Sequence, residues 1–127
     1  MAKIATRGQK PSDFIAFEDD LETGYTRETV TVTLEAGMDR GAVLVLNAGK
    51  YAWCNTAAVA NVANGVAFLV QSVDGLSAGD QQLAVLIRGE AAVMQKGLLW
   101  KGTVSAGDQT TVLNKAKAQG ILTRTQV

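Results

Sequence analysis

The residues of this chain best suited to chemistry are carboxylates that gather near its N-terminus. Asp19 and Asp20 are adjacent, and Glu18 and Glu22 flank them within the stretch DFIAFEDDLE, residues 13–22. Acid–base catalysis needs two carboxylates that the surrounding elements hold in a fixed geometry. These acids lie instead in a polar segment without a sustained hydrophobic period, so we expect no catalytic role for them.

The other residue types exclude further kinds of chemistry. Histidine is absent, which removes Ser-His-Asp and Cys-His nucleophile sites and histidine-ligated metals. The single cysteine, Cys54, cannot form an intramolecular disulfide and has only Lys50 as a basic neighbour, so we expect a small core side chain. The sequence contains no phosphate-binding loop, dinucleotide fingerprint, CxxC pair or calcium loop. We therefore expect no enzyme activity, no metal and no cofactor.

Charge and hydropathy exclude two classes of partner. The 12 basic and 12 acidic residues cancel, so the chain lacks the basic surface that electrostatic binding of nucleic acid requires. The balance is uneven, since residues 1–40 carry five basic and eight acidic side chains, a net of −3, and residues 41–127 carry +3. No run approaches the roughly 20 apolar residues of a membrane span, and the N-terminus lacks the apolar core of a signal peptide. We expect synthesis in the cytoplasm and no direct contact with nucleic acid or membrane.

Short apolar runs separated by glycine-containing turns predict one mainly β domain from about residue 28 onward. Residues 29–34 alternate strictly, with valine and leucine on one face and threonine on the other, as in a half-buried strand. Residues 57–64 fit a loop or one short helical turn. The other predicted strands, of which the first two form a hairpin, are residues 42–46, 50–53, 66–73 and 83–94.

The predicted strand at residues 83–94 is the most informative, because Arg88, Gly89 and Glu90 interrupt its apolar run. A glycine inside a strand marks a bulge or a close approach of another backbone segment. Arg88 and Glu90 would face the same side of a strand, where they would pair with each other or across an edge or an interface.

One helix follows, and Asp108 is its predicted cap. Its buried face is predicted to be Val112, Leu113 and Ala116, and Gly120 is expected to end it. The polar tail, residues 123–127, is expected to be exposed. The whole pattern predicts a mainly β (α+β) fold with one or two short helices, as a compact, glycine-punctuated β-sandwich or barrel-like domain with an extended N-terminal arm.

The order of these pieces resembles the lambda-like phage head decoration proteins, the trimeric cement proteins of tailed-phage capsids. The resemblance covers roughly residues 28–121. It rests on the order of several short segments, with the predicted helix between the last two. The segments are ETVTV (28–32), AG (36–37), RGAVL (40–44), GVAFL (65–69), AVLIRGEA (84–91), LLW (98–100) and GI (120–121).

The resemblance implies a homotrimer on the outer surface of an expanded phage head, made in the host cytoplasm. Its partner would be the major capsid protein, and its role would be to hold the shell against internal DNA pressure without catalysis. It also implies a capsid-binding arm, residues 1–28, ahead of a decoration domain, residues 29–127. This arm differs from better-known family arms, which are richer in proline and small residues. Its expected anchors are Ile4, Phe14, Ile15 and Phe17.

Four residues are candidates for the trimer interface, because aromatic side chains and arginine are enriched at interface centres. They are Trp53, Arg88, Glu90 and Trp100. The alternative for the tryptophans is the core of the protomer, and the alternative for the arm is packing on its own domain. Another β-rich virion part, such as a tail-tube, head-completion or fibre module, is the competing function. A small-molecule or carbohydrate-binding β domain is the third alternative.

Overall fold

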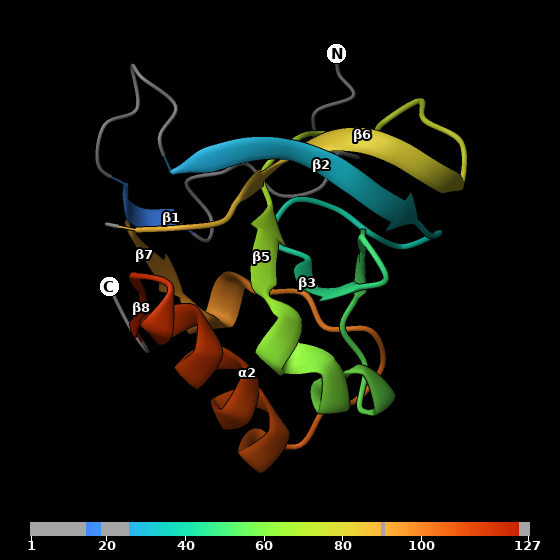
Figure 1. Cartoon of the computed structure of the whole chain (residues 1–127). Helices are drawn as coiled ribbons and strands as arrows, with labels where there is room; N and C mark the ends of the chain where they lie inside the picture. Colours follow the sequence, from blue (N-terminus) through green and yellow to red (C-terminus); the bar gives the residue numbers. More distant parts are fainter. Residues whose placement is uncertain (1–14, 19–25, 90, 125–127) are drawn as a thin grey trace.

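The fold was obtained as a computed structural model, which describes residues 15–18, 26–89 and 91–124. Eight strands, two short 3₁₀ helices and one α-helix make up this part of the chain (Figure 1). In chain order they are β1 (Ile15–Glu18), β2 (Arg27–Leu34), β3 (Val43–Asn47), β4 (Lys50–Trp53), η2 (Ala57–Asn64), β5 (Val66–Leu69), β6 (Gly79–Leu86), β7 (Ala91–Met94), η3 (Gln95–Gly97), α2 (Ala106–Ala118) and β8 (Ile121–Arg124).

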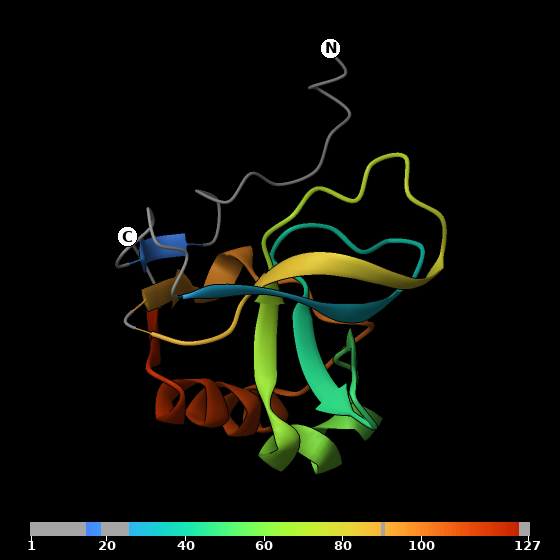
Figure 2. The ribbon, with the colours of Figure 1, turned by 45° about the horizontal axis from the view of Figure 1, so that its top comes forward.

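Five strands close into a barrel in the order β2-β4-β3-β5-β6. β2 pairs with β6 along its whole length and with β4 in parallel, and β3 and β4 form the predicted hairpin. β2 and β6 run side by side as a long curved ribbon, with α2 at the opposite end of the molecule (Figures 1 and 2). The predicted mainly β, barrel-like fold is therefore confirmed.

The barrel interior follows from the alternation in β2. Val32 and Leu34 are buried, whereas the neighbouring Thr31 and Thr33 are more exposed, as the sequence predicted. β3 is different, because Leu44 faces the interior while Val43 and Val45 pack outside the barrel. This burial on both faces explains why residues 42–46 read as a continuous apolar run.

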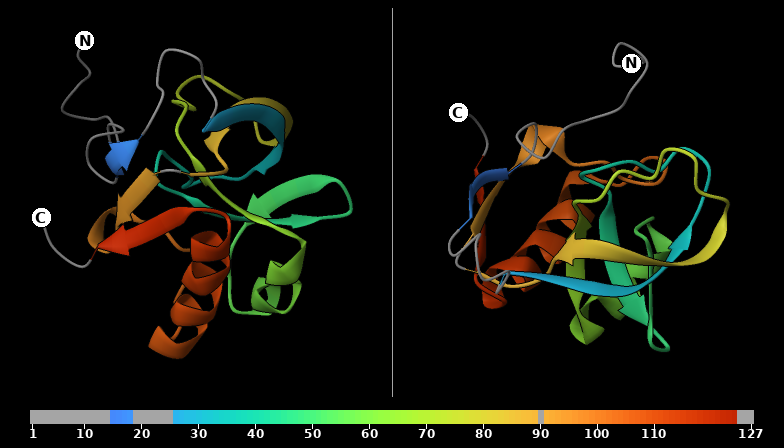
Figure 3. Two further views of the ribbon diagram at one scale, coloured as in Figure 1. Left: turned by 60° about the vertical axis from the view of Figure 1, so that its left-hand side comes forward. Right: turned by 90° about the horizontal axis from the view of Figure 1, so that it is seen from above.

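A second sheet, in the order β1-β7-β8, lies beside the barrel (Figure 3). β7 is fully buried and pairs antiparallel with β1 and parallel with β8. The core consists of two hydrophobic clusters, of which the first lies inside the barrel and includes Val32, Leu34 and Leu44. The second hydrophobic cluster fills the space between this sheet, α2 and the barrel, and its members include Phe68, Val112, Ala116 and Ile121. The sequence did not predict β8, whose residues 123 and 124 were assigned to an exposed tail.

The prediction of one strand over residues 83–94 was wrong. β6 ends at Leu86 and β7 begins at Ala91, and the two belong to different sheets. The close backbone approach expected at Gly89 is confirmed, because a Cβ atom there would lie 1.9 Å from the carbonyl oxygen of Gly120. The Gly89 N–H also donates to the carbonyl of Gln119 over 2.9 Å. This contact joins the segment between β6 and β7 to the C-terminal end of α2.

The helix begins differently from the prediction. The cap is Ser105, whose Oγ accepts from the Asp108 N–H over 3.2 Å, so the assignment of Asp108 as the cap was wrong. Asp108 lies in the first turn of α2, where its negative charge interacts favourably with the helix dipole. The predicted buried face is confirmed, and Gly120 follows the helix with a φ of 93° that suits glycine.

Two other predicted bounds also changed. Residues 57–64 form a 3₁₀ helix of eight residues instead of a loop or a single turn. The strand predicted at residues 66–73 ends at Leu69; Val70 is still buried, and the chain bends into a loop from residue 71. In both segments the residue types allow more than one local structure; in the fold, η2 lies against α2 and β5 pairs with β6.

Candidate functional site

The two tryptophans lie at the margin of the hydrophobic clusters. The indole Nε1 of Trp53 donates to the carbonyl of Leu99 over 3.1 Å, which brings Trp53 next to the segment that carries Trp100. Each ring is partly buried, Trp53 against the barrel interior and Trp100 against the second cluster. The protomer therefore uses part of each ring for its own packing, and part of each remains exposed.

Arg88 forms an ion pair with a residue of the barrel strand β2. Its Nη2 lies 2.6 Å from Oε1 of Glu28 on β2, and the two side chains are 37% and 49% exposed. An ion pair this exposed contributes at most about 1 kcal/mol, so it orients Arg88 more than it stabilises the fold. Glu90, the other charged candidate, lies outside the described residues.

The candidate anchors of the arm divide into two groups. Ile15 lies on β1 opposite Val93 of β7, and its side chain packs against the second hydrophobic cluster. The backbone of Phe17 pairs with Ala92 of the same strand. Ile4 and Phe14 lie outside the described residues. The short strand β1, within the predicted arm, is thus paired with the chain's own sheet.

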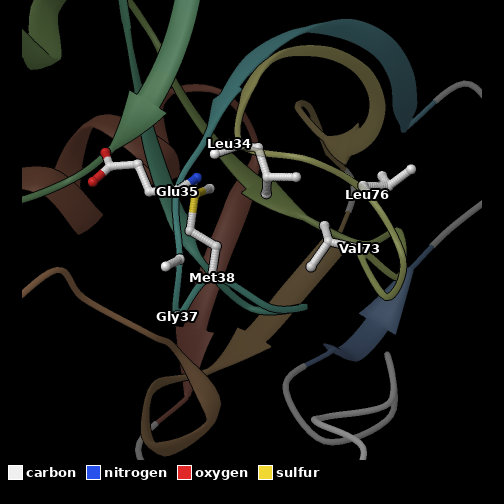
Figure 4. Close-up of a pocket in the computed structure, with 8 residues that line it drawn as sticks. Leu34, Glu35, Gly37, Met38, Val73 and Leu76 are labelled. Carbon is white, nitrogen blue, oxygen red and sulfur yellow. Dashed lines mark hydrogen bonds between the residues drawn. The ribbon is translucent and has the colours of Figure 1, made fainter.

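An apolar hollow opens at the end of the barrel between the end of β2 and the loop after β5. Figure 4 shows Leu34, Met38 and Val73 gathered around it, with Leu76 at its rim. Its volume is about 270 Å³, and Leu76 is 42% exposed. The carboxylate in its lining, Glu35, is held 2.7 Å from the ammonium of Lys101. A hollow with one paired carboxylate suits an apolar side chain better than acid–base chemistry.

A second hollow lies between α2, η3 and β8, with a volume of about 330 Å³. Its lining mixes apolar and polar side chains, including Leu113 and Lys117 of α2 and Leu122 of β8. Leu122 is 52% exposed. Sequence reasoning missed this surface because it depends on β8, and four residues after a glycine carry too short a pattern to predict a strand.

The titratable groups show no catalytic pairing in the described part of the chain. Burial, with a smaller effect of Asp108, raises the pKa of the Cys54 thiol to about 11, so this buried side chain stays protonated and unreactive. The ammonium of Lys50 and the hydroxyl of Thr33 lower the pKa of Asp80 by hydrogen bonding. Within residues 15–18, 26–89 and 91–124, no three His, Cys, Asp or Glu side chains are grouped to hold a metal. No helix of the described residues is long and apolar enough to span a membrane.

The comparison with known families identifies the chain. The family model of bacteriophage lambda head decoration protein D matches residues 4–121. The chain belongs to this family. Searches of curated proteins and of solved structures found no match. Membership in the head decoration family confirms the resemblance found in the sequence and gives the chain a structural role on the phage capsid, as a component of the virion.

Proposed function

We propose that this head decoration protein is a homotrimeric cement that binds the major capsid protein on the outer surface of the expanded head and stabilises the shell against internal DNA pressure. The match of residues 4–121 to the head decoration family carries the proposal, because the match includes nearly all of the predicted arm as well as the domain. It also favours this function over a tail-tube, head-completion or fibre module.

Binding through an arm suits the chemistry of residues 1–28. An extended segment that adds a strand to a capsid-protein sheet gains affinity from backbone hydrogen bonds and needs no deep pocket. Ile4 and Phe14 would give the outer part of this segment apolar anchors. Three arms on one trimer would raise the apparent affinity by as much as about 10²–10⁴ through effective concentration.

The packing of β1 divides the proposed arm into two parts. Ile15 packs against the protomer's hydrophobic cluster, and β1 is paired with β7. We therefore assign residues 15–18 to a root that fixes the arm on the decoration domain, residues 29–127, and residues 1–14 to the part that reaches the capsid. Phe14 stands at the boundary between the two.

A pair of truncations tests this division. Removing residues 2–14 leaves β1 in place, so the variant should remain a trimer by sedimentation velocity but lose binding to expanded shells. A matched variant, Phe14→Ser in the full-length chain, should weaken binding without changing the sedimentation coefficient. Shells that bind the truncated protein as well as wild type would refute the arm as the capsid contact.

The trimer itself is tested at the tryptophans and at Arg88 with Glu90, the proposed interface residues. If Trp100 is an interface anchor, Trp100→Ala should release folded monomers with an unchanged circular dichroism spectrum. If the ring acts only in the protomer core, the same variant should unfold at lower temperature without a folded monomer accumulating. Trp53→Phe tests the other tryptophan in the same way, because it keeps an aromatic ring but loses the hydrogen bond to Leu99.

A further inference from the structure

The outer edge of β8 lies next to the second hollow described above, which forms a groove between α2, η3 and β8. The sheet order is β1-β7-β8, so among the described strands β8 pairs with β7 alone. An edge strand leaves alternate N–H and C=O groups unpaired, which is a template for an extended segment from another chain. Leu122 is 52% exposed beside this edge and would give such a segment an apolar contact.

The groove and its surroundings are basic. Lys117 lines it, Arg124 ends β8, and Lys96 follows the lining residue Gln95. None of the ion pairs found between described residues involves these three cations. The acid of the helix, Asp108, lies nine residues before Lys117, about 13 Å along the axis. The charge of the surface therefore favours an acidic, extended partner.

The chain itself carries a segment of this kind. Glu18 ends β1 at the opposite edge of the same sheet, and Asp19, Asp20 and Glu22 follow it in the sequence. The acidic run thus follows, in the sequence, the strand at one edge of this sheet, and the basic residues lie at its other edge. A contact between these two different surfaces is head-to-tail, and head-to-tail contacts close into rings when the rotation between subunits allows it.

Resting on the homotrimer proposed above, we propose that the acidic run at residues 18–22 of one copy docks on the α2–β8 groove of the next, and that this contact closes the ring of three. The occupant of the groove is a second copy of this chain. The arm residues 1–14 stay available for the capsid, because they precede β1.

Charge reversal at the groove tests the proposal. In sedimentation velocity at physiological salt, Lys117→Glu with Arg124→Glu should raise the dissociation constant of the trimer about tenfold or more, because two attractive contacts become repulsive. Lys115→Glu is the matched control, since it changes the same charge in the same last turn of α2 but does not line the groove. It should leave the dissociation constant within about twofold of wild type.

The occupant is tested by exchanging the charges. Asp19→Lys with Asp20→Lys should weaken the trimer as much as the groove variant does, and combining all four substitutions should restore it. Leu122→Ser, at a side chain that is already half exposed, is a second variant that should weaken the trimer without affecting folding.

Each other outcome overturns a defined part of the account. A wild-type trimer that ignores every one of these substitutions refutes the contact and leaves the homotrimer standing. Loss of the trimer without restoration in the combined variant refutes the acidic run as the occupant. A wild-type chain that is monomeric at all concentrations refutes the homotrimer itself, and with it this contact.

Discussion

Replacing Gln119 with methionine should be among the most destabilising polar substitutions in the described part of the chain. The side chain of Gln119 projects from the end of α2 onto the barrel. Its Nε2 donates to the carbonyls of Val66 over 2.7 Å and Ile87 over 2.8 Å, and its Oε1 accepts from the Val66 N–H over 2.9 Å. Gln119 thus pairs with β5 as a neighbouring strand would, and it also holds the residue that follows β6.

The magnitude follows from what methionine leaves behind. Methionine has nearly the same volume and flexibility as glutamine, so lost hydrogen bonds and not a cavity dominate the cost. Val66 is fully buried, so water cannot replace its lost partner. Each unsatisfied group costs about 1–3 kcal/mol, so the N–H and C=O of Val66 together predict a loss of about 2–6 kcal/mol. This is a large part of the roughly 5–15 kcal/mol that stabilises a typical domain.

Urea unfolding followed by circular dichroism measures the effect, with wild type and variant at one protomer concentration because association shifts apparent stability. Gln82→Met is the control, since Gln82 is exposed and its Nε2 donates to the hydroxyl of Thr31 at the surface. It should change the unfolding free energy by less than about 0.5 kcal/mol. A loss below about 1 kcal/mol for Gln119→Met would show that this side chain does not hold the barrel to the helix.

Three further predictions concern single sites. Gly89→Ala should prevent folding to the native state, because the new Cβ would lie 1.9 Å from the Gly120 carbonyl oxygen. Gly107→Ala, where the new Cβ would have no atom within 4 Å, should fold normally. Expression in the soluble fraction and circular dichroism distinguish the two variants. Cys54 should react with a thiol reagent at neutral pH only as fast as the protein unfolds, and rapid labelling of native protein would contradict its burial and its pKa of about 11. Since the pKa of Asp80 is lowered in the folded chain, its contribution to stability should be present above its ordinary pKa and disappear as pH falls through the lowered value. Unfolding of Asp80→Asn between pH 2 and about 6 should therefore depend less on pH than that of wild type, and identical profiles would refute this linkage.

The parts of the fold that could be predicted from the sequence are those set by local pattern. The alternation in β2, the double-sided burial of β3, and the buried face of α2 all follow from side-chain periodicity. The glycine at position 89 also carried a correct signal, because only glycine permits the contact with Gly120.

The errors share a different cause. The break between β6 and β7 and the existence of β8 depend on pairing between segments that lie far apart in the sequence, which no local pattern reports. Ser105 and Asp108 are both good capping residues, and which of them caps depends on the helix start. The groove beside β8 was missed for the same reason as β8, and the pairing of Arg88 with Glu28 needed the barrel to bring β2 beside the crossing.

The measurement that tests the central claim most directly is co-sedimentation of the purified chain with expanded shells of its phage that lack it, read as copies bound per shell. We predict saturable binding in multiples of three at defined surface positions, with little binding to shells that have not expanded. Absence of binding to expanded shells, with the free protein forming long tubes or filaments, would contradict the capsid cement and point to another part of the virion.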